Sequence, residues 1–287
     1  MHMGVYAVTG SASGMGHEVA RKLRDAGNTV IGVDIKEADI VADLSTPGGR
    51  RAAADGVLAA SGGKLDGAVL AAGVGPTPGA GRLHLIAQVN YLGVVDLLEA
   101  WRPALAATDR AKVVVFSSNS TTSTPLVPTR AVRALLAHDA EKAVRAVKLF
   151  GKVAPTMAYA ASKIAVSRWV RRHAVTREWA GAGIRLNALA PGAIMTPLLE
   201  KQLSTPAEAK VIRSFPVPIG GFGEAGQLAD WVVFMLSDAA DFLCGSVVFV
   251  DGGSDAYFRA DDWPRAVPAR ALIPYLTRFR AFARRQR

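Results

Sequence analysis

Thr9-Gly10-Ser11-Ala12-Ser13-Gly14-Met15-Gly16 is the stretch that decides the fold. It follows an apolar run at residues 5–8 and precedes a helical pattern, so it predicts a strand, a glycine-rich turn and a helix. Glycines at positions 10, 14 and 16 let the backbone turn sharply and approach a pyrophosphate, whose charge is stabilised at the helix N-terminus. A left-handed turn that serves packing alone is the alternative, and the βαβ context favours the dinucleotide.

The second predicted strand, residues 29–33, ends at Asp34, eighteen residues after Gly16. An acidic side chain at this place accepts hydrogen bonds from the adenosine ribose hydroxyls and repels a 2′-phosphate. Ser13, directly before Gly14, offers no positive charge to such a phosphate. We therefore expect NAD rather than NADP, with a solvated strand end as the alternative role of Asp34.

Two further segments are expected to border the same cofactor. A short strand at residues 40–42 leads to Asp43 and Leu44, whose carboxylate or backbone we place near the adenine, while Asp43 fits equally well as a helix cap. The buried strand 67–71 leads to Ala72-Gly73, whose small side chains let the backbone lie against a cofactor.

The rest of the chain alternates apolar strands with amphipathic helices. Further strands are predicted at residues 112–116, 184–190 and 246–250, and helices at about 46–60, 84–107, from 159 onward and at 224–236. This alternation predicts an α/β protein with a doubly wound, seven-stranded parallel sheet of the Rossmann type. Residues 119–158 are too long for an ordinary connection, so we interpret them as a helical insertion.

Composition limits the classes of function. The chain has 287 residues, 50% of them hydrophobic, and one cysteine, which excludes an internal disulfide. No stretch has the length of a transmembrane helix or the layout of a signal peptide, so we expect a soluble, cytoplasmic protein. The net charge of +10 includes +6 after Phe258, which leaves the body mildly basic and argues against a nucleic-acid binder. No metal site is expected.

Four polar residues are candidates for chemistry. Tyr159 and Lys163 lie four apart on a predicted helix, so they share one face, and a nearby ammonium should lower the pKa of the phenol. Ser118 follows a central strand, at the sheet edge where open parallel sheets bind ligands. Asn90 lies among apolar residues of a helix, where a structural role is the more common one.

These elements together resemble the short-chain dehydrogenase/reductase superfamily. The resemblance spans residues 4–254 and is closest to the 3α-hydroxysteroid dehydrogenase/carbonyl reductase group. The residues that carry it are Thr9-Gly10-x-x-x-Gly14-x-Gly16, Asn90, Ser118, Tyr159-x-x-x-Lys163, Pro191-Gly192 and Asp251-Gly252-Gly253. Where the family commonly has Asn-Asn-Ala-Gly, this chain has Leu70-Ala71-Ala72-Gly73, from which we expect a modest loss of cofactor affinity.

The resemblance implies a role for each matching residue. Tyr159 would be the acid/base, Ser118 would hold the substrate oxygen, and Lys163 would lower the phenol pKa and hold the nicotinamide ribose. Asn90 would support a water-linked proton path. The implied NAD site comprises Gly10, Ser13, Gly14, Met15, Gly16, Asp34, Ile35, Asp43, Leu44, Ala72, Gly73, Tyr159, Lys163, Pro191, Gly192, Ile194 and Thr196.

The expected function is NAD(H)-dependent interconversion of a secondary alcohol and a ketone, with a hydroxysteroid or similar bulky cyclic alcohol as substrate. A non-catalytic dinucleotide sensor or scaffold on the same fold is the alternative. We expect residues 1–258 to form the dehydrogenase domain, with the insertion at 119–158 and a substrate loop at 193–222. A homodimer or homotetramer is expected, with the insertion near an interface.

Residues 259–287 form a basic C-terminal extension. From Pro274, a residue that suits a first helical position, an apolar stripe of Tyr275, Leu276, Phe279, Phe282 and Ala283 is expected among arginines. Packing of this helix on its own body or on a neighbouring subunit is the favoured fate. Disorder and contact with an acidic membrane surface are the alternatives, and the stripe is short for membrane anchoring without a second signal.

Overall fold

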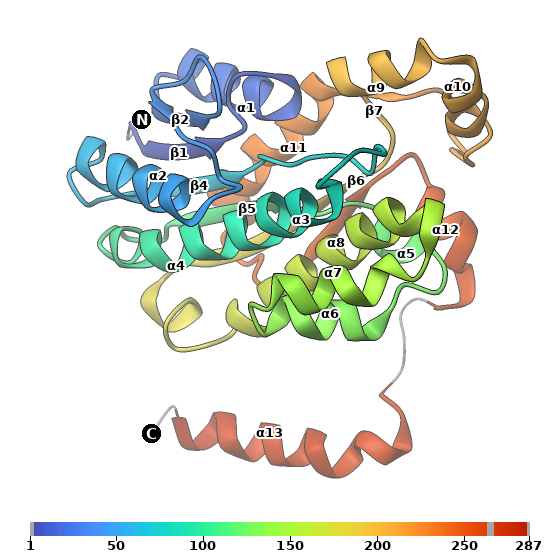
Figure 1. Cartoon of the computed structure of the whole chain (residues 1–287). Helices are drawn as coiled ribbons and strands as arrows, with labels where there is room; N and C mark the ends of the chain where they lie inside the picture. Colours follow the sequence, from blue (N-terminus) through green and yellow to red (C-terminus); the bar gives the residue numbers. More distant parts are fainter. Residues whose placement is uncertain (1–2, 263–266, 286–287) are drawn as a thin grey trace.

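A seven-stranded parallel sheet forms the centre of the computed structural model, which describes residues 3–262 and 267–285 (Figure 1). The strand order is β3-β2-β1-β4-β5-β6-β9, which confirms the predicted doubly wound sheet. The strands are β1 (Val5–Thr9), β2 (Thr29–Asp34), β3 (Ile40–Val41), β4 (Gly67–Leu70), β5 (Lys112–Phe116), β6 (Arg185–Pro191) and β9 (Val247–Val250). The order reverses between β1 and β4, so a crevice is expected beyond their carboxyl ends.

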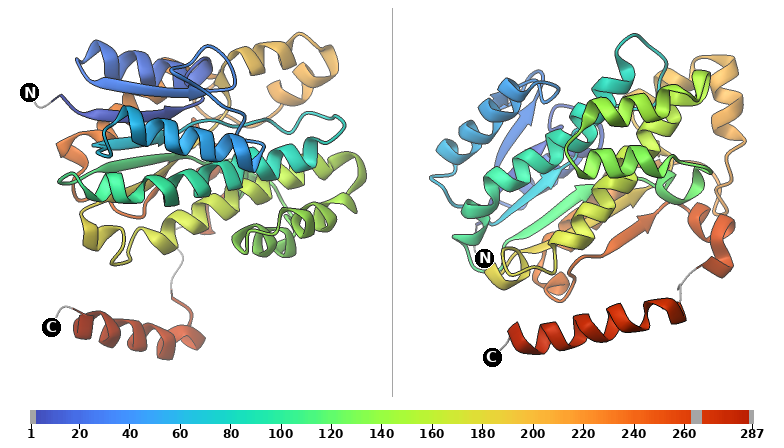
Figure 2. Two further views of the ribbon diagram at one scale, coloured as in Figure 1. Left: turned by 60° about the vertical axis from the view of Figure 1, so that its left-hand side comes forward. Right: turned by 60° about the horizontal axis from the view of Figure 1, so that its bottom comes forward.

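Helices cover both faces of the sheet (Figure 2). One face carries α1 (Gly14–Asp25) and α11 (Ala225–Leu236), and the other carries α2 (Pro47–Ala60), α4 (Gly93–Ala106) and α8 (Ala154–His173). Successive strand residues enter opposite cores: in β4, Ala68 and Leu70 join the core under α4, while Val69 joins the core under α1. Burial on both sides explains why these strands have uninterrupted apolar sequences.

The helix predicted at 84–107 contains an irregular turn. It consists of α3 (Arg82–Ala87), a π-helical segment at Gln88–Leu92 and α4, in one continuous run. A π turn holds one extra residue per turn and is frequent at functional sites. Here it carries Asn90, which is fully buried.

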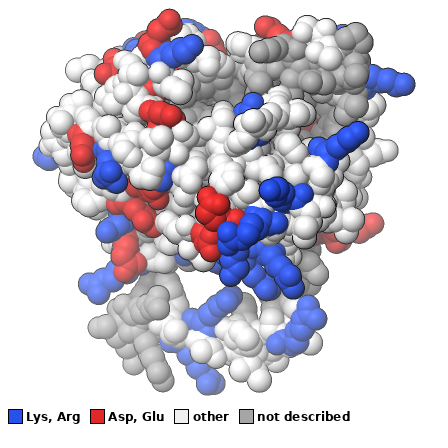
Figure 3. Space-filling model, in the orientation of Figure 1, with Lys and Arg blue, Asp and Glu red and all other residues white. Residues whose placement is uncertain are grey.

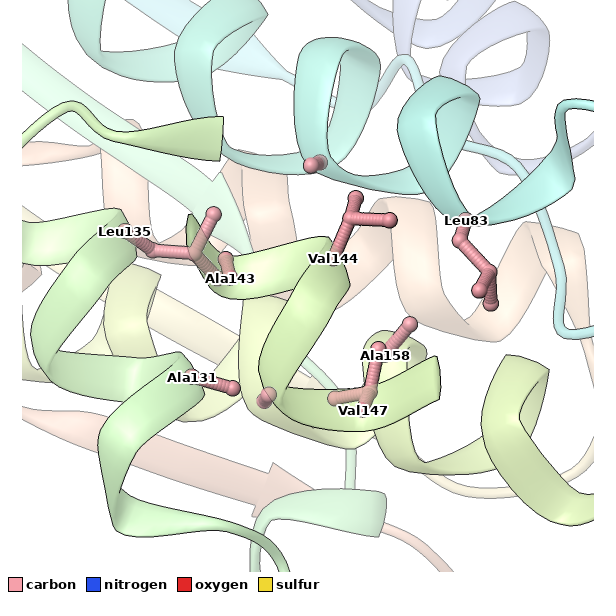
Figure 4. A pocket seen from close by; sticks show the side chains of 9 residues that line it. Leu83, Ala131, Leu135, Ala143, Val144, Val147 and Ala158 are labelled. Atoms are coloured by element: carbon pink, nitrogen blue, oxygen red, sulfur yellow. The ribbon is translucent and has the colours of Figure 1, made fainter. Parts of the chain in front are cut away.

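The insertion is helical, as predicted. It comprises α5 (Ser120–Ser123), α6 (Thr129–Leu136) and α7 (Ala140–Lys148), and α8 then begins at Ala154, five residues before Tyr159. Figure 4 shows apolar side chains of α6 and α7, among them Val144, facing Leu83 of α3 and Ala158 of α8. The space left between them is about 10 Å³, near the minimum for one water molecule, so the insertion is closely packed on the body.

A second, small sheet that the sequence did not predict joins the start of the predicted substrate loop at 193–222 to the residues just after it. Its strands are β7 (Ile194–Met195) and β8 (Gly223–Glu224), and helices α9 (Pro197–Leu203) and α10 (Pro206–Arg213) lie between them. Strands of two residues are too short to show the alternation of apolar and polar side chains by which a strand is recognised in a sequence. The far end of the loop is fixed by α12 (Ser254–Arg259), where the Ser254 hydroxyl donates to the carbonyl oxygen of Pro216 at 2.7 Å.

The C-terminal helix α13 (Leu272–Arg285) stands apart from the rest of the ribbon in Figure 1. It begins before Pro274, which is its third residue and not its first. Its described apolar side chains are exposed: Leu272, Ile273, Tyr275, Leu276 and Phe282. The side chains of Phe279 and Ala283 lie outside the described set. The idea that the tail packs on its own body is therefore wrong, and packing on a neighbouring subunit stays a prediction.

The first glycine-rich turn allows a stability test. A Cβ atom added at Gly16 would lie 2.2 Å from the carbonyl oxygen of Gly10, so Gly16→Ala must push α1 away from β1. We expect a loss of about 1–3 kcal/mol in the free energy of unfolding, measured by thermal denaturation.

The matched control is Gly48→Ala in α2, where an added Cβ meets no atom within 4 Å. The substitution replaces a helical glycine with alanine where the added methyl group meets no neighbour. We therefore expect the free energy of unfolding to increase by about 0.5–1 kcal/mol. Equal effects of the two substitutions would contradict the close approach at Gly16.

Candidate active site

A cleft of about 340 Å³ follows the carboxyl ends of β1, β2 and β4. Most of the residues predicted to bind a dinucleotide line it: Gly10, Ser13, Gly14, Met15, Gly16, Asp34, Ile35, Asp43, Leu44, Ala72, Gly73 and Thr196. The crevice therefore lies where the reversal of strand order places it.

The glycine-rich turn shapes one wall of this cleft. Gly10 has a positive φ of 71°, and a Cβ atom there would lie 2.8 Å from the backbone nitrogen of Ala72. Only glycine lets β1 and the end of β4 approach so closely. Ser13 is extended at the start of α1 and makes no side-chain capping bond, and the first turn holds no acidic residue. The helix N-terminus is thus open to an anion.

Asp34 holds the adjoining loop together. Its carboxylate accepts hydrogen bonds from the backbone N–H of Ala12 at 3.0 Å and of Ile35 at 2.7 Å. A carboxylate offers about four acceptor positions, so capacity remains for hydroxyl groups in the cleft. Asp34 is therefore a shaping residue as well as a candidate ligand.

Asp43 does not cap the following helix, which corrects one of the two roles offered for it. Its carboxylate accepts from the backbone N–H of Ser45 at 2.9 Å, while Thr46 caps α2 by accepting from Gly49 at 2.9 Å. Asp43 thus fixes the turn that places Leu44 on the cleft wall.

A second cavity of about 140 Å³ adjoins the first. Ser118 from the end of β5 and Tyr159 and Lys163 from α8 line it together with Pro191 and Gly192. The two cavities share Met15, Ala71, Gly73 and Val74, so they lie side by side along one stretch of the backbone. The neighbouring Ser117 also lines this cavity, and its hydroxyl is hydrogen-bonded to that of Ser167 at 2.7 Å.

The electrostatics of the Tyr159–Lys163 pair differ from expectation. Burial raises the pKa of the Tyr159 phenol above its usual value, and a hydrogen bond with Ser118 offsets this in part. The Nζ of Lys163 lies 5.8 Å from the centre of the Tyr159 ring and donates to the carbonyl oxygen of Phe116 at 2.7 Å. Burial also lowers the pKa of Lys163 to about 8. The expected lowering of the phenol pKa by Lys163 is therefore wrong for this state of the protein.

Asn90 acts on the backbone in this structure. Its side-chain Nδ2 donates to the carbonyl oxygen of Val74 at 3.0 Å, and its Oδ1 accepts from the N–H of Val74 at 2.8 Å. Asn90 thus holds the loop after β4, which lines both cavities, and lines neither itself. Its role in a proton path stays a prediction.

The role predicted for Ile194 concerns its backbone, which would hold the nicotinamide carboxamide together with Thr196. Its side chain is buried against Gly223 of β8 and is not part of either cavity lining, whereas Thr196 and Pro197 reach the cleft. The short β7–β8 pairing directs Ile194 inward. Only its backbone remains a candidate for contact with a nicotinamide.

The sequence did not predict two residues that line the cleft, nor Arg50, which supports Leu44 of the cleft wall without lining the cleft itself. Leu85 and Val89 line the cleft from the helix before Asn90, and their spacing of four residues was the available signal. Arg50 is buried under the adenine end, where it donates to the carbonyl oxygen of Leu44 at 3.1 Å and to Asp96 at 2.7 Å. No local pattern marks Arg50, because its partners lie elsewhere in the chain.

Comparison with known proteins identifies the family. The 3-alpha-hydroxysteroid dehydrogenase/carbonyl reductase of Comamonas testosteroni is 37% identical over 257 residues, which cover 90% of this chain and 98% of that protein. The chain belongs to the short-chain dehydrogenase/reductase family. A family profile described as enoyl-(acyl carrier protein) reductase matches residues 129–255 of this family member. The predicted resemblance is confirmed.

Two further relatives of this short-chain dehydrogenase/reductase are informative. The crystal structure of the 3-alpha-hydroxysteroid dehydrogenase from Pseudomonas sp. B-0831, complexed with NADH, has 43% identity and a TM-score of 0.84, and the match covers 90% of this chain and 100% of that one. Cis-4-hydroxycyclohexanecarboxylate dehydrogenase of Sinomonas cyclohexanicum is 32% identical over 88% of this chain and 96% of its own. The chain is thus an oxidoreductase related to the hydroxysteroid dehydrogenase/carbonyl reductase.

Lys163 gives this short-chain dehydrogenase/reductase a testable pH dependence. Because its pKa falls to about 8 in the folded protein, the unfolded chain binds the proton more tightly, and stability should rise from pH 8 to pH 10. Lys163→Met lacks this titration and should not show the rise. The free energy of unfolding of the variant minus that of wild type should therefore be more positive at pH 7 than at pH 10, by about 1–3 kcal/mol. Urea unfolding measures the difference.

Lys64→Met is the control, because Lys64 is exposed and should leave the pH profile as in wild type. A wild-type stability that stays flat or falls between pH 8 and pH 10 would contradict the buried, easily deprotonated lysine.

Proposed function

We propose that this chain is an NAD(H)-dependent dehydrogenase/reductase that interconverts a secondary alcohol and a ketone. The observation that carries the proposal is that Ser118, Tyr159 and Lys163 converge on a cavity that adjoins the dinucleotide-type cleft. A non-catalytic sensor would have no need of all three side chains at one point.

Each of the three side chains has a role that its surroundings support. Tyr159 exchanges the hydroxyl proton of the substrate, and Ser118, hydrogen-bonded to it, orients the substrate oxygen. Lys163, whose pKa lies near 8, holds the nicotinamide ribose and supplies positive charge beside the phenol when protonated. The bound nicotinamide supplies the hydride chemistry.

The residues of the cleft fit NAD rather than NADP. The open N-terminus of α1 suits a pyrophosphate, and the Asp34 carboxylate at the end of β2 suits ribose hydroxyls and repels a 2′-phosphate. The relative from Pseudomonas sp. B-0831 was solved with NADH, which supports the same choice here.

A hydroxysteroid or another bulky cyclic alcohol is the proposed substrate. The relatives from Comamonas testosteroni and Sinomonas cyclohexanicum are named for a 3-alpha-hydroxysteroid and for cis-4-hydroxycyclohexanecarboxylate, both of them cyclic alcohols. The sequence of the loop at 193–222, rich in Leu, Pro and Gly, is compatible with an apolar substrate, and its residues Thr196 and Pro197 border the dinucleotide-type cleft. A homodimer or homotetramer remains our expectation for the assembly.

The direct test is a screen of secondary alcohols with NAD and of ketones with NADH, followed at the nicotinamide absorbance. Cyclic and steroidal compounds should give the highest kcat/KM. Binding of NADH without turnover of any compound would favour the sensor alternative.

Tyr159→Phe tests the acid/base. Phenylalanine keeps the ring in place but lacks the hydroxyl group that would exchange the proton. The kcat should therefore fall by about 10²–10⁴-fold, while the Kd for NADH stays within a small factor of the wild-type value. Tyr257→Phe, which changes an exposed tyrosine, is the matched control and should be neutral. Retained turnover in Tyr159→Phe would remove this residue from the mechanism.

Asp34→Ala tests the cofactor preference. It should weaken NAD binding and relax the rejection of NADP, because it removes both the charge and the hydrogen bonds. Asp34→Asn retains one carbonyl acceptor for the N–H of Ala12 or Ile35, so comparing the two variants by fluorescence titration separates charge from loop support. A wild-type protein that prefers NADP would refute the assignment.

A further inference from the structure

All of the net charge resides in two segments. Residues 119–158 hold six basic and two acidic side chains, and residues 259–287 hold eight basic and two acidic ones. The 20 basic and 20 acidic side chains of the remaining chain cancel. The excess of +10 therefore belongs to the insertion and the C-terminal extension, and the rest of the body is neutral.

The basic side chains of the insertion face solvent. Those of Arg130, Arg133, Lys142, Arg145, Lys148 and Lys152 are exposed. Within the described residues none of these six takes part in an ion pair. Figure 3 shows Lys and Arg gathered over the part of the molecule where α6 and α7 lie, with further basic residues on the C-terminal helix below.

The two acidic residues of the insertion each have a bonding partner other than its basic side chains. The Asp139 carboxylate caps α7 by accepting from the N–H of Lys142 at 2.8 Å, and Glu141 lies 3.1 Å from His84. Six basic side chains against these two acidic ones leave the insertion with a net charge of +4, so its surface potential is positive.

Exposed apolar side chains accompany this charge. The insertion corner, residues 148–153, joins α7 to α8 and exposes Leu149 at 90%, Val153 at 51% and Phe150 at 36%. Lys148 and Lys152 flank Leu149 and Phe150, and Val153 follows Lys152 directly. Apolar side chains set among lysines at a corner suit insertion into the headgroup region of a bilayer.

The C-terminal helix α13 shows the same combination. Ile273 is 77% exposed and Phe282 is 62% exposed, and Arg270, Arg278 and Arg280 are exposed beside them. A single short amphipathic helix binds lipid only marginally. The insertion corner supplies the second attachment point that such a helix needs, because linked weak sites reinforce one another.

We infer that the insertion corner and helix α13 together bind an anionic lipid surface. Lipid binding by these segments competes with the expected subunit interface near the insertion: a second copy that presented the same two segments would set positive charge against positive charge. Duplex nucleic acid matches the charge and leaves Leu149, Ile273 and Phe282 without an apolar environment. No helix in the described ranges is long and apolar enough to cross a membrane, so the attachment is to the surface.

Vesicle sedimentation of the full chain tests this inference. Wild-type protein should sediment with phosphatidylcholine vesicles that contain phosphatidylserine, and should be released by salt or when phosphatidylserine is omitted. The double variant Lys148→Glu/Lys152→Glu should bind at least roughly tenfold more weakly. Arg51→Glu/Lys64→Glu makes the same change in net charge on the neutral part of the body and should bind nearly as wild type does.

Leu149→Ser and Ile273→Ser test the apolar contribution, and both should weaken vesicle binding while the melting temperature stays unchanged, because both side chains are exposed. Failure of the wild type to bind anionic vesicles at low salt overturns the inference. Equal losses in the two charge-reversed variants, binding of duplex DNA in place of vesicles, or an oligomer that Ile273→Ser dissociates without any vesicle binding also overturn it. The assay measures no catalysis, so its result is independent of the proposed function.

Discussion

The close approach of α1 to the end of β1 is the constraint on which the rest of the structure depends. At Gly16 there is no room for even a methyl group, because the carbonyl oxygen of Gly10 occupies the place where it would lie. At Gly10 the backbone turns against the end of β4 in the same way. These two contacts bring the N-terminus of α1 and the ends of β2 and β4 to one point, so the cleft exists because side chains are absent there.

Much of the fold and of the candidate site could be predicted from local patterns. The seven strands have continuous apolar sequences, and the cleft residues from Gly10 to Gly73 follow strand ends, which parallel topology brings to one edge. What local patterns could not predict depends on partners far along the chain. Arg50 looks like a solvated helix residue until Asp96 and Leu44 are placed beside it, and the β7–β8 pairing joins two segments almost thirty residues apart.

The electrostatic predictions failed for a related reason. Four-residue spacing on a helix correctly placed Tyr159 and Lys163 on one cavity, but spacing carries no information about burial. Desolvation acts on both groups and favours their neutral forms, so it raises the pKa of the phenol and lowers that of the amine. The exposed apolar face of α13 was misjudged likewise, because its stripe predicts amphipathicity and does not predict what covers it.

The place of β9 in the sheet has a consequence for how the protein is made. Its neighbour β6 ends at Pro191, whereas β9 begins at Val247, so during synthesis the outer edge of β6 is unpaired until the substrate loop and α11 have also emerged. An unpaired strand edge is a template for wrong association. The cleft wall from Gly10 to Gly73, by contrast, emerges entirely within the first third of translation. The nascent chain can therefore assemble its nucleotide-binding half early. Premature termination before Val247 leaves an incomplete sheet with an exposed, aggregation-prone edge, which is a substrate for chaperones and proteases.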